Sequence, residues 1–147
     1  MMNKKIPDPF IRKAIFDLYN GTIVDGKTIN VYDTRYTSNS KELEGYVIMG
    51  IQSNDVSYNK CSNFWESEIL LEVCTIYRGV SNPGSRLFAD RILEALRLAL
   101  QANLDLDFAT SGLTVDSQLM TMPSDLTTNL LNGTLQRKFL RLSLRIK

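Results

Sequence analysis

The chain has 147 residues, 44% of them hydrophobic, and its 17 Lys and Arg residues nearly balance its 16 Asp and Glu residues. This length fits one domain with a hydrophobic core, so we expect a single domain over residues 1–147 with a short flexible N-terminus at residues 1–7. The net charge of +1 argues against nucleic-acid binding driven by bulk charge, and the lack of histidine excludes a histidine-based metal site or catalytic triad.

Residues 8–21, DPFIRKAIFDLYNG, carry the pattern of an amphipathic helix. Asp8 suits the N-cap, Pro9 suits the first helical position, and Asn20-Gly21 is a stop signal. An apolar stripe recurs at helical spacing and comprises Phe10, Ile11, Ala14, Ile15 and Leu18. We interpret this stripe as core-facing rather than as a docking surface.

Two strands are expected next, a short one at residues 29–32 and a longer one at residues 45–53. The run Tyr46-Val47-Ile48-Met49 is apolar on both faces, which indicates a central place in a sheet. Residues 54–63, NDVSYNKCSN, have the polar composition of a loop.

Long loops often carry function. We therefore take Asp55, Tyr58 and Lys60 as candidates for contacting a partner.

The third strand, residues 64–77, alternates clearly. Its apolar positions of one parity are Trp65, Ile69, Leu71, Val73 and Tyr77. Its acidic positions of the other parity are Glu66, Glu68 and Glu72. Alternation of period two predicts one buried face and one face open to water or to a partner.

After the SNPG turn, residues 84–102 predict a second helix. Its core stripe comprises Phe88, Ile92, Ala95, Leu96 and Ala99. Leu87, Leu93 and Leu100 widen the apolar surface, so we expect this helix to be mostly covered.

The C-terminal part predicts a fourth strand at residues 111–122, a loop or helical turn at residues 123–133, and a fifth strand at residues 134–147. In the fifth strand one parity holds Leu140, Leu142, Leu144 and Ile146, and the other holds Arg137, Arg141 and Arg145. The expected fold class is α+β, a mostly antiparallel four- to five-stranded sheet with two helices packed on one face.

The glutamate row and the arginine row allow two interpretations. If their strands are neighbours, the rows pair within one chain, each pair contributing roughly 0.2–1 kcal/mol. Alternatively, each row meets the opposite row of an adjacent copy, where charge pattern fixes register. The candidate subunit-interface residues are therefore Glu66, Glu68, Glu72, Arg137, Arg141 and Arg145. Phosphate binding by the arginines is less favoured, because the glutamates would oppose it.

No motif for catalysis or metal binding stands out. There is no phosphate-binding glycine loop and no Cys-x-x-Cys element. Asp105 and Asp107 fit a solvated loop better than a metal half-site, and we expect no enzyme activity, catalytic residue, metal or cofactor. Cys61 and Cys74 do not indicate a disulfide, and Cys74 fits a buried thiol. No signal peptide or membrane span is expected.

The element order resembles the tail-completion and tail-terminator (head–tail joining) proteins of tailed bacteriophages. That family has a Y-V-x-x-G strand, an extended strand and an A-x-x-I-x-x-A-L helix in this order. The first motif matches Tyr46, Val47 and Gly50, and the last matches Ala89, Ile92, Ala95 and Leu96.

The resemblance implies a structural virion protein of the tail or neck, assembled in the host cytoplasm. It would form a ring of six or twelve copies that contacts portal, adaptor or tail-tube proteins while DNA passes through the lumen without sequence-specific binding, and it would not involve a membrane. The alternative is a small non-viral adaptor module that binds another protein.

Overall fold

The computed structural model describes residues 8–34, 42–58, 63–77, 85–103, 115–122, 125–130 and 133–146. The N-terminal residues 1–7, expected to be flexible, lie outside this description. The described elements are α1 (Asp8–Tyr19), β1 (Thr22–Val24), β2 (Lys27–Tyr32), β3 (Glu44–Tyr58), β4 (Asn63–Tyr77), α2 (Ser85–Asn103), β5 (Val115–Thr121), β6 (Asp125–Leu130) and β7 (Gly133–Ile146).

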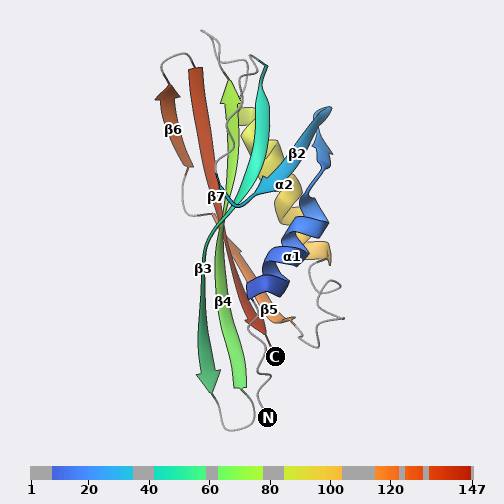
Figure 1. Cartoon of the computed structure of the whole chain (residues 1–147), viewed down its shortest axis with the longest axis vertical. Coiled ribbons are helices and arrows are strands. Elements are labelled where there is room, and N and C mark those ends of the chain that lie inside the picture. Colours follow the sequence, from blue (N-terminus) through green and yellow to red (C-terminus); the bar gives the residue numbers. More distant parts are fainter. Residues whose placement is uncertain are drawn as a thin grey trace.

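The fold is α+β, as predicted, with both helices on one side of a sheet (Figure 1). The sheet is larger than expected. Within the described residues it has seven strands in the order β1-β2-β3-β4-β7-β5, with β6 also paired to β7. The prediction of four to five strands is therefore wrong. Most pairings are antiparallel, but β2 and β3 pair in parallel, so the sheet is mixed.

Three strand assignments differ from the sequence prediction. Strand β1 was not predicted, and β6 occupies residues expected to form a loop or helical turn. Strand β3 continues to Tyr58, through residues expected to be the beginning of a loop. In each case the ladder hydrogen bonds to a neighbouring strand hold a segment whose own hydrophobic pattern is weak.

The first helix ends as its sequence predicts, and a tight hairpin follows. Gly21 has φ +85°, beyond the end of α1 at Tyr19. Asp25 and Gly26 join β1 to β2 with φ values of 51° and 77°. Positive φ at both central residues is the requirement of the type I′ turn, for which Asp-Gly is a preferred pair.

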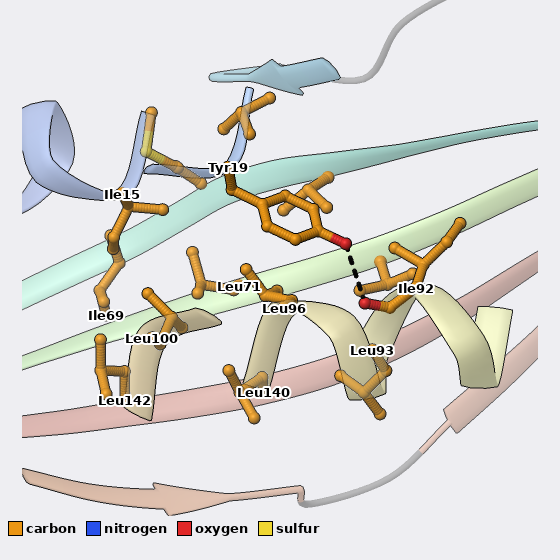
Figure 2. Packing of buried hydrophobic residues seen from close by; sticks show 14 of the residues in the cluster. Ile15, Tyr19, Ile69, Leu71, Ile92, Leu93, Leu96, Leu100, Leu140 and Leu142 are labelled. Carbon is orange, nitrogen blue, oxygen red and sulfur yellow. Dashed lines mark hydrogen bonds between the residues drawn. The ribbon is translucent and has the colours of Figure 1, made fainter. Parts of the chain in front are cut away.

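The main core lies between the helices and the sheet (Figure 2). The predicted stripe of α1 is confirmed, since Ile11, Ala14 and Ile15 are buried. Tyr19, which was not predicted, is also fully buried, and its hydroxyl donates a hydrogen bond to the Ile92 carbonyl at 3.0 Å. This bond joins the two helices through the middle of the core.

The second helix is less covered than expected. Leu93 and Leu100 are buried, but Leu87 and Leu98 are 54% and 51% exposed. A stripe of α2 therefore faces away from the sheet.

A β-bulge interrupts β3 between Met49 and Gln52, where the register with β4 shifts. A Cβ atom on Gly50 would lie 2.8 Å from the Leu70 backbone oxygen, so only glycine fits here. Arg12 of α1 donates to the Gly50 carbonyl at 2.7 Å and to Gln52 Oε1 at 2.9 Å. This arginine fixes the bulge to the first helix.

A second, smaller apolar cluster lies on the face of the sheet opposite the helices. Its buried members are Tyr46, Ile48, Cys74, Ile76 and Leu135. The double-sided apolar run of β3 is thus explained, because Val47 and Met49 join the main core instead. The face expected to be open is therefore partly apolar.

Candidate functional site

The outer face, as we call the side of β4 and β7 opposite the helices, brings the six predicted interface residues together. The register pairs Glu66 directly with Arg145. Their side chains form an ion pair at 3.0 Å, and Glu68 pairs with Arg141 at 3.2 Å. Glu72 pairs with Arg137 in the same way. Both rows thus meet inside one chain, as the first interpretation expected.

The three ion pairs are of two kinds. Glu66 and Arg145 lie directly opposite, whereas Glu68 and Glu72 reach diagonally, because their direct partners are Ser143 and Phe139. Diagonal neighbours on adjacent strands remain within reach of long side chains. The result is a ladder of three ion pairs along the outer face, with the negative charges on β4 and the positive charges on β7.

The exposed fraction of the paired side chains differs along this ladder. The side chains of Glu72 and Arg137 are only 13% and 25% exposed, whereas the other two pairs are 46–49% exposed. The hydrogen bond that Arg137 donates to the Glu72 carboxylate raises the pKa of Arg137, whose guanidinium also lies 5.4 Å from the centre of the Phe139 ring. The Glu72–Arg137 pair therefore mainly stabilises the sheet. The two half-exposed pairs keep enough accessible surface to contact another molecule.

The outer face is hollowed at the half-exposed end of the ladder. The hollow has a volume of about 490 Å³. Its lining is mostly polar and comprises Ser53, Glu66, Ser67, Glu68, Ser117, Gln118, Leu119, Ser143, Leu144 and Arg145. It extends from β3 to β5, so four neighbouring strands contribute to it.

Two of the three partner-contact candidates lie in a strand and not in a loop as predicted. Asp55 and Tyr58 are strand residues of β3, opposite Glu66 and Asn63 of β4. Lys60 lies outside the described residues. The β3–β4 hairpin continues past both helices to the lower end of the molecule in Figure 1. Asp55 and Tyr58 therefore lie on a projecting arm.

The other acidic residues in the described part of the chain do not converge on a site. Asp33 accepts a hydrogen bond from Arg12 at 3.2 Å, while Glu42 and Glu44 line a separate pocket of about 260 Å³ beside β2. Asp105 and Asp107 lie outside the described residues. Among the described residues, no group of three or more Asp, Glu, Cys or His side chains could hold a metal ion.

The Cys74 thiol is buried and free of any disulfide, as expected, whereas Cys61 lies outside the described residues. Burial, followed by the nearby Glu72 charge, raises the pKa of Cys74, and the thiol donates to Glu72 Oε1 at 3.2 Å. Burial therefore favours the protonated thiol, as in a structural core cysteine.

The sequence analysis did not predict the role of Arg12, which links the first helix to the bulge of β3. Its guanidinium joins α1 both to Asp33, just after β2, and to the bulge of β3. An arginine in an amphipathic helix gives no signal of such a role. Gly50, whose carbonyl accepts one of these bonds, was visible only as part of a strand motif.

Neither described helix is both long and apolar enough to cross a membrane. No protein-family profile matches the sequence, and no curated protein sequence matches it. The fold is similar to that of a chain in the solved structure described as "Virion of native gene transfer agent (GTA) particle". The TM-score is 0.50 and the sequence identity 14%, over 78% of this chain and 78% of that chain. The two chains share a fold across most of their lengths.

Proposed function

We propose that this chain is a structural protein of a phage-like virion. The observation that carries the proposal is the fold shared with a chain of a gene transfer agent virion over 78% of both chains. The outer face adds to it, since its chemistry is that of recognition: paired charges, serines and a shallow hollow.

Within the virion, we propose a ring at the head–tail connector or at the tail terminus, with DNA passing through its lumen. Support comes from the element order and from the half-exposed Glu66–Arg145 and Glu68–Arg141 pairs. Identical subunits close a ring only through head-to-tail contacts between two different surfaces. A charge ladder suits such a contact, because it penalises wrong registers more than it adds affinity.

The proposed role is structural, and it involves no catalysis. Ordered copies of one chain would join larger assemblies around a passage, and portal, adaptor or tail-tube proteins would be the neighbours. Any contact with DNA would be independent of base sequence. The arginines of the outer face would contribute little to it, because they already have carboxylate partners within the chain.

Electron microscopy of the purified protein, and of particles carrying it, tests the proposal. We expect closed rings of six or twelve copies, and labelled protein at the junction of head and tail. A monomer absent from particles would contradict it. A one-to-one complex with an unrelated protein would favour an adaptor role instead.

A further inference from the structure

The half of the sheet that lies lower in Figure 1 has β3 at one edge and β5 at the other. Here the strand order is β3-β4-β7-β5, and β2 pairs with β3 only opposite Tyr46, Val47 and Ile48. Residues 52–58 of β3 therefore pair with β4 alone, and residues 115–121 of β5 pair with β7 alone, within the described part of the chain. A row of backbone N–H and C=O groups on such an edge is a template for another strand.

We propose that β5 of one copy pairs with residues 52–58 of β3 in the next copy, so that one sheet continues through the assembly. We call this contact the edge joint. This inference rests on the proposed ring and adds a second contact, along the sheet edges, to the one proposed for the outer face. The occupant of each edge is a second copy of this chain.

Arg12 defines where the free edge of β3 begins. Its guanidinium donates to the carbonyl groups of Met49 and Gly50 at 3.5 and 2.7 Å. The backbone carbonyls at the bulge are thereby satisfied inside the chain, just after β2 leaves β3. From Gln52 onward the strand pairs with β4 on its other side only.

Strand direction favours the joint. Each of the steps β3–β4, β4–β7 and β7–β5 is antiparallel, so β3 and β5 run in opposite directions. A second copy placed in the same orientation along the sheet would bring its β5 antiparallel to β3. Because the two edges differ, the contact is head-to-tail and repeats, which a ring requires.

The sequences of the two edges carry no lysine or proline, and each has a single charged residue, Asp55 in β3 and Asp116 in β5. Natural edge strands are commonly protected by lysine, proline or short length. The edge of β3 reads QSNDVSY and β5 reads VDSQLMT, with no Lys, Arg or Pro in either. Leu119 of β5 is 63% exposed, an apolar side chain that a neighbouring strand would cover.

The rows of side chains also align across the outer face. Ser53, Glu68, Ser143 and Leu119 are successive partners from β3 to β5. Adding a copy would place its Leu119, or a residue two positions away, beside Ser53. Within one chain Ser53 and Leu119 are three strand spacings apart, roughly 14 Å, which a disulfide cannot span.

Paired cysteines test the joint in the full-length chain with Cys61→Ser as background. Ser53→Cys is combined in turn with Ser117→Cys, Leu119→Cys and Thr121→Cys, since these exposed positions share the outer face. We expect at least one pair to give a ladder of covalent oligomers on mild oxidation. The matched control is Ser53→Cys with Ile23→Cys, where Ile23 is 68% exposed on β1 and should give no ladder beyond dimer.

Light scattering of the unoxidised protein separates the possible failures. An oligomer without any specific ladder would overturn the edge joint and leave the ring intact. A monomer under all conditions would overturn both. A ladder from the control as strong as from the test pairs would also count against the joint.

A charge on the edge gives a second, independent test. Leu119→Lys should raise the concentration needed for assembly by at least about tenfold. Ile23→Lys should leave that concentration unchanged. Both variants should keep the wild-type unfolding midpoint, because both side chains are exposed. An unaltered assembly of Leu119→Lys would contradict the proposal.

Discussion

Alternate residues of β4 and β7 form the two faces of these strands, and the two faces differ in burial and charge. On the covered face Leu71, Leu140 and Leu142 are fully buried under the helices. On the outer face Glu68 and Arg141 are paired but nearly half exposed. The covered face therefore determines stability, and the outer face has surface left for recognition. Variants of each face should accordingly fail in different assays.

The largest effect is expected on the covered face. Leu140→Ala should lower the free energy of unfolding by about 2–5 kcal/mol, because truncation leaves a cavity in the main core. Denaturant titration measures this loss. Leu119→Ala, at a position 63% exposed, is the matched control and should change stability by no more than about 0.5 kcal/mol. Equal losses would refute the distinction between the faces.

The next effect concerns the link between α1 and the bulge. Arg12→Met should cost about 1–3 kcal/mol, since it leaves the Gly50 carbonyl and the Gln52 side chain without this donor. Arg12→Lys should restore little, because an ammonium cannot reproduce the fork of a guanidinium. Lys13→Met, one residue along the same helix and pointing to solvent, should be nearly neutral. Thermal melting compares the three variants.

A smaller effect depends on pH. In the folded chain burial keeps the Cys74 thiol protonated, whereas in the unfolded chain a thiol ionises above about pH 8.5. Unfolding then releases a proton, so this contribution to stability is complete below pH 8.5 and is lost as the pH rises above it. Urea midpoints between about pH 7 and 10 should fall more for the wild type than for Cys74→Ala. Parallel curves would contradict the buried, protonated thiol.

The smallest effect on stability is expected on the outer face. Arg141→Glu breaks a half-exposed pair and should cost about 1 kcal/mol or less in unfolding. The same change should weaken assembly much more, since it reverses a charge on the proposed contact surface. Thermal melting and sizing chromatography report the two effects separately. Losses of equal size would favour a pair that serves only the single chain.

The sequence predicts the parts of the fold where burial alternates strongly. Both helices and the long strands β4 and β7 were placed correctly, because each carries a full apolar stripe or face. Strands β1 and β6 have no such face. The signal for β1 was the hairpin dipeptide Asp25-Gly26. Asn132-Gly133 was taken for the end of a loop, and β7 begins at Gly133.

The outer face was predictable only in part. The parity of Glu66 and Arg145 puts each charge on one side of its strand, but only the register of β4 with β7 places them opposite each other. Register is a property of two strands together, so one strand's pattern cannot give it. The parallel pairing of β2 with β3 and the Arg12 contacts depend on tertiary packing in the same way.

The mass of the purified wild-type protein, followed by native mass spectrometry over a range of concentrations, tests most directly whether the chain acts by assembly. We predict a discrete species of six or twelve subunits, weakened by Arg141→Glu. A protein that stays monomeric at every concentration, with folded stability intact, would contradict the account.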